Sequence, residues 1–403
     1  MFVVDLPAHS LYLRFMNLIT DNDSLLAFCK KLSGTAYITV DTEFLREKTY
    51  WPLLCLLQIG GPDEAAAIDT LAPGLDLEPV YELFDDHSIL KVFHAGRQDL
   101  EIFYNLTGRL PVPVFDTQVA AMVCGFGDSI GYEHLVSKLA GKRIDKSSRF
   151  TDWSLRPLSP KQIDYALGDV IHLRPVYEKL AEKLAENDRA RWIDEEMEIL
   201  TRPETYAGDP SLAYKRIKGR APSPRYLAVL RELAAWRERE AQRRDVPRNR
   251  VLRDEALIEI AHHTPDNVAR LARTRGLGDK TAEGRYGREL LEAVKVGKEL
   301  PNADCPKLQE KIDLPRGLGP VTDILKVLLK MKCENFDVAG KLLANSADVE
   351  KIAAFGEDAD VPALSGWRRE VFGDDALKLR SGELAVVING KKLELVELDG
   401  EDT

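Results

Sequence analysis

Two carboxylates stand two residues apart in the stretch YITVDTEFLRE, residues 37–47. The residues before them, YITV, are mostly β-branched or aromatic, which favours a strand whose side chains alternate between its two faces. Asp41 and Glu43 are therefore predicted to share one face. Like charges at that separation repel each other, and a divalent cation with oxygen ligands is the usual partner of such a pair. The alternative is that both acids are simply solvated at the end of a strand.

Three further residues extend this chemistry. Asp99, in VFHAGRQDLEIF, falls in the first turn of a predicted helix that follows a strand, where a carboxylate also suits the helix dipole. Asp169 lies on a later predicted helix, and Tyr165 stands four residues before it, so that a phenol and a carboxylate project from one face. Taken alone, Asp99 is also compatible with an ordinary first-turn acid, and the Tyr165–Asp169 pair with a surface or half-buried hydrogen bond.

The elements that would position these residues follow from the pattern of apolar runs. Between residues 37 and 115 short apolar runs alternate with amphipathic stretches, which predicts an α/β domain with a mixed sheet and a hairpin within residues 52–67. Mostly helices follow. The longest begins at SPKQ, where Ser159 as N-cap, Pro160 at the first helical position and Gln162 as capping-box partner mark its start.

Two breaks divide the remainder. The stretches RPETYAGDPSLAY and KELPNADCPK are rich in proline, glycine and polar residues and are predicted to be linkers. Between them, Ser223-Pro224 opens a long helix that Pro247 ends, and two further helices are expected at about 252–262 and 265–274. These boundaries predict three domains, which comprise residues 1–207, 208–295 and 296–403.

The third predicted domain combines helices with a terminal hairpin. Helical patterns occupy about 319–333 and 335–354. The chain then finishes with ELAVVINGKKLELVEL, in which Asn389-Gly390 lies between two alternating runs and predicts a type I′ turn.

Composition describes a globular chain without a membrane span. It is 44% hydrophobic and 30% charged, and it contains no apolar run near the ~20 residues that a spanning helix needs. The stretch MFVVDLPAHS lacks the basic and apolar pattern of a signal peptide, so we expect a cytoplasmic location. Five scattered cysteines without a C-x-x-C pair indicate neither a disulfide framework nor a zinc site.

Charge is distributed unevenly along the chain. The net charge is −10, yet residues 208–295 carry 20 Lys and Arg against 13 Asp and Glu, whereas the segments on either side are acidic. Such a basic module suggests a polyanionic partner, and a mixed-charge helical surface without any ligand is the alternative. Eight of these cations flank the long helix, four before it and four around its end: Lys215, Arg216, Lys218, Arg220, Arg243, Arg244, Arg248 and Arg250.

The order of the four acids resembles that of the DEDD superfamily of 3′→5′ exonucleases. The stretches VDTEFLREKTYWPLLCLLQIG, FHAGRQDLEIF and DWSLRPLSPKQIDYALGDVIHL are similar to the three exonuclease motifs of the ribonuclease D family. The basic module resembles that family's HRDC (helicase and RNase D C-terminal) domain. The resemblance is strong over residues 35–295 and weaker beyond 300. It implies a ribonuclease H-like, DnaQ-type α/β exonuclease domain with a mixed sheet, followed by two small all-α HRDC-type domains, the second diverged.

The superfamily divides by the residue that precedes the last Asp, a His five residues ahead of it or a Tyr four ahead. Here those positions are Asp164 and Tyr165, so the sequence fits the tyrosine branch, DEDDy. His94 and His172 do not have the spacing of the missing histidine and are predicted to be core or supporting residues.

The resemblance also implies a metal-assisted chemistry. Two divalent cations, Mg²⁺ or Mn²⁺, would activate a water and stabilise the departing 3′-oxygen. Asp41 would bridge both ions, Glu43 and Asp169 would hold the ion that carries the nucleophile, and Asp99 would reach the other one. Tyr165 would orient the attacking water. Residues that we expect to contact the substrate are Thr42, Phe44 and Leu45 at the terminal nucleotide, and Lys142, Lys146 and Arg149 at its phosphates.

The expected function is that of a monomeric 3′→5′ exoribonuclease that binds RNA with a free single-stranded 3′ end. It would release 5′-mononucleotides and trim the 3′ ends of tRNA precursors and other small structured RNAs. A DNA 3′→5′ exonuclease of the same superfamily is the first alternative. The second is a catalytically silent RNA-binding scaffold, from which an acid would be expected to have been lost, and none of the four is missing.

Overall fold

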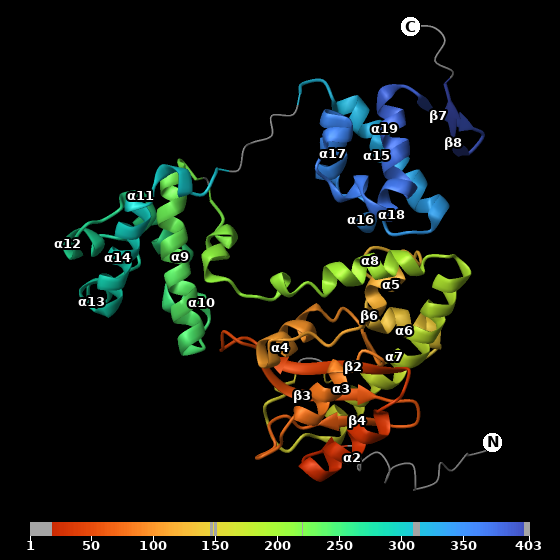
Figure 1. The fold of residues 1–403 in the computed structure, drawn as a ribbon, viewed down its shortest axis with the longest axis horizontal. Coiled ribbons are helices and arrows are strands. Elements are labelled where there is room, and N and C mark those ends of the chain that lie inside the picture. Colours follow the sequence, from red (N-terminus) through yellow and green to blue (C-terminus); the bar gives the residue numbers. More distant parts are fainter. Residues whose placement is uncertain (1–17, 146–147, 149–150, 220, 309–314, 399–403) are drawn as a thin grey trace.

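The computed structural model describes residues 18–145, 148, 151–219, 221–308 and 315–398. The chain forms an α/β unit, a helical module that lies to one side of it, and a second helical unit that lies over α8 (Figure 1). Among the described residues, no helix is both long enough and apolar enough to cross a membrane.

The α/β unit is built on one mixed sheet. Its six strands have the order β1-β4-β3-β2-β5-β6, in which β2 pairs antiparallel with β3, β3 pairs antiparallel with β4, and the other neighbours are parallel. The mixed sheet and the β3–β4 hairpin are thus confirmed. The strands are β1 (Leu18–Ile19), β2 (Tyr37–Leu45), β3 (Leu53–Gly60), β4 (Ala65–Ile68), β5 (Leu90–Phe93) and β6 (Val114–Asp116).

Seven helices accompany this sheet in the described part of the α/β unit. The longest is α7, which packs against β2, β3 and β4 and begins with the predicted capping box of Ser159 and Gln162. The helices are α2 (Asn22–Leu32), α3 (Glu78–Asp85), α4 (Arg97–Thr107), α5 (Thr117–Val123), α6 (Tyr132–Ala140), α7 (Pro160–Glu186) and α8 (Ala190–Leu200).

The basic module is all helical and has an apolar core of its own. Its main helix, α9, runs from the N-cap Ser223 to a left-handed C-cap at Asp245. The helix expected at 265–274 is much shorter, because Asn267 caps it late and Gly276 and Gly278 adopt positive φ soon after it. The elements are η2 (Pro210–Arg216), α9 (Pro224–Arg244), α10 (Arg248–Val251), α11 (Asp254–His263), α12 (Val268–Leu271), α13 (Asp279–Glu283) and α14 (Arg285–Glu299).

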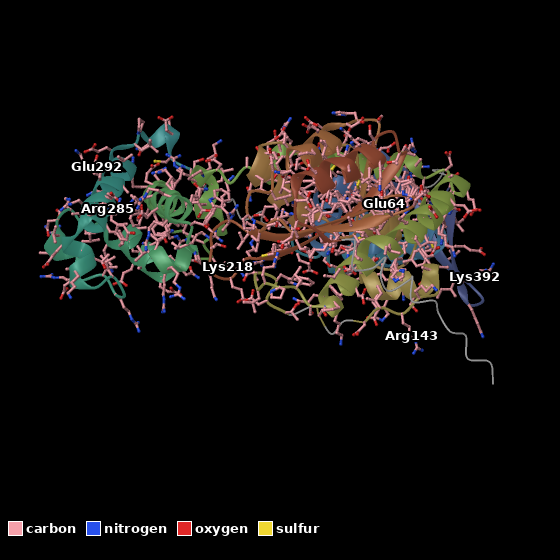
Figure 2. The ribbon with its side chains drawn as sticks, turned by 90° about the horizontal axis from the view of Figure 1, so that it is seen from below. Glu64, Arg143, Lys218, Arg285, Glu292 and Lys392 are labelled. Atoms are coloured by element: carbon pink, nitrogen blue, oxygen red, sulfur yellow. The ribbon has the colours of Figure 1, made fainter. Side chains whose placement is uncertain are left out.

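The segment predicted as the first linker contains two short 3₁₀ helices, η1 (Pro203–Thr205) and η2. Figure 2 shows Arg285 and Glu292 on the helical module and Lys218 nearer to the α/β unit. The module therefore stands beside the α/β unit and presents its first residues toward it.

The third unit also differs in detail from the prediction. The helix expected at 335–354 is divided, because the left-handed Asp337 ends one helix and the capping box of Asn345 starts another. The elements are α15 (Gly319–Phe336), α16 (Gly340–Leu343), α17 (Ser346–Phe355), α18 (Gly366–Arg368), the π-helix η6 (Arg369–Gly373) and α19 (Asp374–Ser381), followed by β7 (Leu384–Asn389) and β8 (Lys392–Glu397).

The terminal hairpin is confirmed, but its turn type is not the predicted one. Asn389 pairs with Lys392, so the two turn residues are Gly390 and Lys391. Of these, only Gly390 has a positive φ, 61°. A type I′ turn needs a positive φ at both central residues, whereas glycine at the first position alone is the pattern of type II′.

The two helical units share a local pattern. In each, a long helix ends at a left-handed Asp followed by Val, a four-residue helix comes next, and a ten-residue helix follows. The cap residues Asp245 and Asp337 have nearly identical backbone angles, φ 48° and ψ 53° against φ 46° and ψ 54°. Each end of α16 and α17 lies the same number of residues further along the chain than the corresponding end of α10 and α11.

The third unit packs on the α/β unit. One apolar cluster includes Leu180 of α7, Leu328 of α15 and Trp367 of α18. The ring of Trp367 stacks on Trp192 of α8, with centroids 4.4 Å apart. Beside this stack, Arg368 forms an ion pair with the buried Glu196 at 2.5 Å. The third unit is therefore joined to α8 by apolar and charged contacts.

Candidate active site

A cleft of about 450 Å³ opens where β2 meets α7. Asp41, Thr42 and Glu43 line it from β2, and Tyr165 and Asp169 line it from α7. The predicted residues of two segments far apart in the sequence thus face one cavity. A volume of this size lies within the range of ordinary small-molecule and nucleotide sites.

Three of the four predicted metal ligands meet in this cleft. Each of Asp41, Glu43 and Asp169 offers a carboxylate oxygen that lies within 4.8 Å of the other two. Asp41 and Glu43 share a face of β2 because side chains alternate along a strand. After Glu43 the register with β3 shifts, so that the paired stretch of β2 is irregular just beyond the two acids.

Close packing of α7 on the sheet brings Asp169 to the other two acids. The Thr39 hydroxyl, on β2, donates to the carbonyl of Val170 at 2.8 Å. This approach requires a glycine on β3, because a Cβ at Gly60 would lie 2.4 Å from Thr39 Oγ1. The residue that follows Asp169 is therefore tied to the strand that carries Asp41.

The electrostatics of the cluster favour a cation. Burial raises the pKa of Asp41 well above its usual range, and the charges of Asp169, Asp99 and Glu43 raise it further. Each carboxylate makes its neighbour harder to ionise, and a divalent cation bound among them would remove that cost. The all-oxygen set fits Mg²⁺ and Mn²⁺, which prefer carboxylate ligands.

Asp99 lies beside this group but is not one of the three. It is buried in the first turn of α4, and its carboxylate accepts a hydrogen bond from the Thr42 hydroxyl. Burial raises the pKa of Asp99 to about 7, and the Thr42 hydrogen bond opposes that rise. Its role as a ligand stays a prediction.

The remaining predicted contacts are only partly gathered at the cleft. Thr42 lines it, whereas Phe44 and Leu45 are not among its lining residues, and Leu45 packs against an apolar cluster instead. Lys142 lies near His172, whose pKa it lowers further below the value that burial sets. Lys146 and Arg149 lie outside the described residues.

A second cavity, of about 270 Å³, adjoins the first at Ile144 and Tyr165. Arg143 and Lys161 line it together with His172 of α7. Asp145, which pairs with Lys161 at 3.6 Å, and Asp164 line this cavity too, so it carries both signs of charge. Its two cations lie beside the acidic cleft, where they would suit an incoming phosphate backbone. Arg143 belongs to the basic loop that was predicted near this position, whereas Lys161 was not predicted.

Sequence reasoning did not single out two further residues of the cleft wall. The hydroxyl of Tyr132, at the start of α6, donates to the carbonyl of Asp169 at 2.5 Å. Gln118 of α5 lines the same wall. Neither belongs to a spaced motif, so only the tertiary contact reveals them. His94, which was expected to be a supporting residue, also lines the cleft.

Two known families match parts of the chain. A family described as a 3′-5′ exonuclease matches residues 16–185, and one described as the HRDC domain matches residues 226–294. Fold and site thus define a phosphodiester-hydrolysing 3′–5′ exonuclease that carries an HRDC domain.

Relatives with high sequence identity show which family of exonucleases the chain belongs to. The chain is 51% identical over 380 residues to ribonuclease D of Granulibacter bethesdensis. The aligned region covers 94% of this chain and 96% of that protein. It is 50% identical over 384 residues to ribonuclease D of Jannaschia sp., with 94% and 99% covered. The chain belongs to the ribonuclease D family and is a 3′–5′ exoribonuclease.

A solved structure agrees in fold over most of the chain. The crystal structure of Escherichia coli RNase D superimposes with a TM-score of 0.77 at 31% identity, over 91% of this chain and 98% of that one. That protein is described as an exoribonuclease involved in structured RNA processing. The DnaQ-type exonuclease domain expected from the motifs is confirmed.

Proposed function

We propose that the cleft removes nucleotides one at a time from the 3′ end of RNA and releases 5′-mononucleotides. One observation carries this proposal, the convergence of Asp41, Glu43 and Asp169 within 4.8 Å beside Tyr165. The substrates that we favour are tRNA precursors and other small structured RNAs. E. coli RNase D, which is described as involved in structured RNA processing, supports that choice.

Asp41, Glu43 and Asp169, with Asp99 next to them, would hold two Mg²⁺ or Mn²⁺ ions. Bound there, the ions would lower the pKa of the attacking water and neutralise charge on the leaving 3′-oxygen. We assign Asp41 to both ions, Glu43 and Asp169 to one, and Asp99 to the other.

Tyr165 would position the attacking water by a hydrogen bond from its phenol. It lines the cleft one helical turn from Asp169, and its ring stands 6.1 Å from that of Trp153. Trp153 is buried, and Tyr165 packs against the apolar cluster to which it belongs. We keep Thr42, Phe44, Leu45 and Lys142 as contacts of the incoming strand, with Lys146 and Arg149 next to them in the sequence.

We propose the domain division 1–207, 208–295 and 296–403, with a second, diverged HRDC-like domain as the third. The repeated order of a long helix, a left-handed Asp, a four-residue helix and a ten-residue helix supports this division. The third domain bears on α8 and shares an apolar cluster with the exonuclease domain, so its role would be largely structural. We further propose that the protein acts as a monomer in the cytoplasm.

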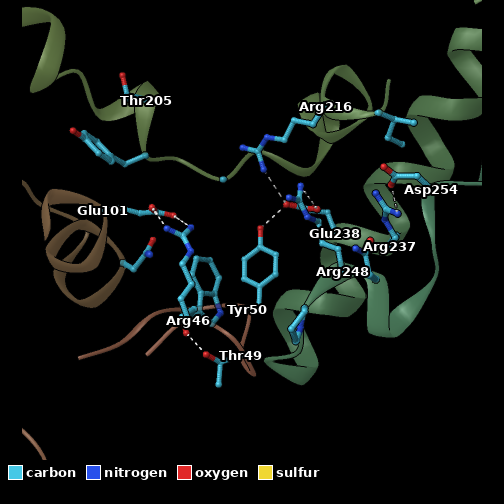
Figure 3. Close-up of a pocket in the computed structure, with 17 residues that line it drawn as sticks. Arg46, Thr49, Tyr50, Glu101, Thr205, Arg216, Arg237, Glu238, Arg248 and Asp254 are labelled. Carbon is cyan, nitrogen blue, oxygen red and sulfur yellow. Dashed lines mark hydrogen bonds and ion pairs between the residues drawn. The ribbon is translucent and has the colours of Figure 1, made fainter. Parts of the chain in front are cut away.

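The HRDC module would hold the body of a folded RNA, but only some of the eight cations that flank its long helix are available for that. Arg216 and Arg248 turn toward the buried Glu238, at 3.4 and 3.7 Å, in a cavity of about 370 Å³ between the module and the exonuclease domain (Figure 3). Arg243 pairs with Glu240 at 2.8 Å, and Arg244 donates to Tyr286.

Lys215, Lys218 and Arg250 are exposed and would supply the phosphate contacts, whereas Arg220 lies outside the described residues. The RNA-holding surface that we propose is therefore the Lys215–Lys218 segment together with Arg250. It is smaller than the charge of the whole module suggests.

Matched RNA and DNA oligomers, labelled at the 5′ end and incubated with and without EDTA, test the function. We expect a ladder that shortens from the 3′ end on RNA and stops with EDTA. Equal cleavage of DNA would favour the alternative of a DNA exonuclease. Binding of RNA without any cleavage in Mg²⁺ or Mn²⁺ would favour the silent scaffold.

A further inference from the structure

His94 stands at the end of β5, in the wall of the catalytic cleft. The backbone that aims it is unusual, because the next residue, Ala95, has a φ of 55°. Asp116 stabilises this turn, since its carboxylate accepts from the N–H groups of Ala95 at 3.0 Å and Gly96 at 2.8 Å. A left-handed non-glycine residue held in this way is typical of functional sites.

The hydrogen bonds around the ring fix its tautomer. The Thr117 hydroxyl lies 3.0 Å from the carbonyl of Phe93 and 3.0 Å from Nδ1 of His94. A carbonyl can only accept, so the single hydroxyl proton goes to Phe93. Nδ1 must then carry a proton and donate it to Thr117. Burial lowers the pKa of His94 below its ordinary value, which keeps the ring neutral at pH 7.

In a neutral ring protonated at Nδ1, Nε2 is a bare acceptor. Nε2 of His94 is buried and has no hydrogen-bond partner among the described residues. Tyr132 does not supply a donor. Its ring centroid lies 5.3 Å from that of His94, but its hydroxyl donates to the carbonyl of Asp169. A buried acceptor without a donor is costly and calls for a partner.

We propose that Nε2 of His94 accepts a hydrogen bond from a ribose 2′-hydroxyl at the 3′ end of the RNA. This inference rests on the proposed function. Phosphate oxygens cannot donate, and the donors of the bases differ from base to base. The 3′-hydroxyl is a donor too, but it is present only on the last nucleotide and is shared with DNA, whereas the 2′-hydroxyl is the donor that every RNA nucleotide has and DNA lacks. Substrates altered only at a 2′ position separate these two hydroxyls. His94 is then a residue that discriminates RNA from DNA.

Nε2 is buried in this structure, so the hydroxyl would reach it only after a small displacement of the wall. Tyr132 is in ring contact with His94 and bonded to the backbone of α7. Entry of the strand would therefore shift a residue that is also tied to Asp169. The same contact would link recognition of the sugar to the position of a metal ligand.

Substrates with a single altered 2′ position test this proposal. The strands are an oligoribonucleotide and versions with 2′-fluoro or 2′-deoxy at the last or the next-to-last nucleotide. Because 2′-fluoro cannot donate, wild-type kcat/KM should fall about 3- to 10-fold at one of these positions, the effect of one hydrogen bond. His94→Asn, which keeps a donor toward Thr117 but has no acceptor at the Nε2 position, should cleave RNA and 2′-fluoro RNA equally.

His94→Gln is the matched control, because its amide oxygen restores an acceptor near the Nε2 position. It should recover part of the discrimination, and thermal unfolding of all three proteins reports whether they fold. The proposal is overturned if the ratio of kcat/KM between RNA and 2′-fluoro RNA is the same in wild type and His94→Asn. It is also overturned if neither altered position changes kcat/KM of the wild type. Failure of the proposed function would instead appear as a wild type that leaves the unmodified RNA intact.

Discussion

The phenol of Tyr50 donates a hydrogen bond to the carboxylate of Glu238 at 2.5 Å, across the boundary between the exonuclease domain and the HRDC module (Figure 3). Tyr50 lies on the connection that leaves β2, and Glu238 lies on α9. The backbone N–H groups of Tyr50 and Trp51 also donate to Asp245, each at 3.0 Å. The module therefore holds the segment that follows the strand of Asp41 and Glu43.

Removing this phenol should loosen the boundary. Tyr50→Phe leaves the buried carboxylate of Glu238 without its closest donor, which should cost about 1–3 kcal/mol in the free energy of unfolding. Denaturant titration measures that loss. Tyr81→Phe on α3 removes the same hydroxyl away from this boundary and should have a smaller effect. Equal losses in the two variants would mean that the hydrogen bond adds little.

Asp41→Asn should abolish turnover and yet stabilise the metal-free protein. The pKa of Asp41 is raised in the folded state, so its ionisation lowers stability as pH rises from about 4 through that raised pKa. The variant lacks this loss and should unfold at a higher temperature than wild type at pH 7.5 in EDTA. Mg²⁺ should raise the unfolding temperature of wild type more than that of the variant. Residual activity above a few per cent would contradict the shared-ligand role.

Tyr165→Phe should lower kcat by roughly 10²- to 10⁴-fold with RNA affinity nearly unchanged, the range expected when a group that positions a proton is lost. Single-turnover rates and equilibrium binding separate the two effects. An unchanged kcat would assign Tyr165 to packing against Trp153 instead. A loss confined to binding would make it a substrate contact.

Lys91 should give the unfolding free energy a pH dependence of opposite sign to that of Asp41. Its amine is fully buried, donates to the carbonyls of Asp86 at 2.7 Å and Val112 at 2.8 Å, and has a pKa that burial lowers to about 8. Below that pH the folded protein bears the cost of a buried charge. Between pH 8 and 10 the unfolded chain stays protonated while the folded amine loses its proton, so stability rises.

The measurement compares wild type with Lys91→Met, since the buried cysteines and tyrosines titrate in both proteins. The difference in unfolding free energy should move in favour of wild type by about 1 kcal/mol per pH unit between pH 8 and 10. A difference that stays flat with pH would show that Lys91 is charged or neutral throughout.

Lys215, Lys218 and Arg250 should account for much of the salt dependence of RNA binding. Replacing all three with alanine should weaken affinity for a folded tRNA precursor. It should also reduce the slope of log K against log salt by up to about 3, because each phosphate that a cation neutralises contributes about one to that slope. Hydrolysis of short unstructured oligomers should change little. An unaltered slope would leave the module with a purely structural role, and truncation after residue 207 should then impair short and folded substrates alike.

The sequence alone determined the features that are encoded within one segment. The run YITV made a strand, and alternation along it placed Asp41 and Glu43 on one face. Ser159 and Gln162 started α7 in the predicted position, and the spacing of Tyr165 and Asp169 put them on one side of that helix. The order of the four acids was sufficient to indicate the family, because motif order does not depend on how the segments pack.

Only the tertiary structure decided which groups meet across the chain. Asp99 accepts from Thr42 rather than joining the other three acids, Tyr132 is bonded to the backbone of Asp169, and Arg216 is turned toward Glu238. The bare Nε2 of His94 follows from Thr117 and Phe93 together. Each of these interactions joins residues on different elements, so no local periodicity or capping signal records it. Burial, hydrogen-bond direction and charge pairing are set when the elements pack, and they determine what each side chain can still do.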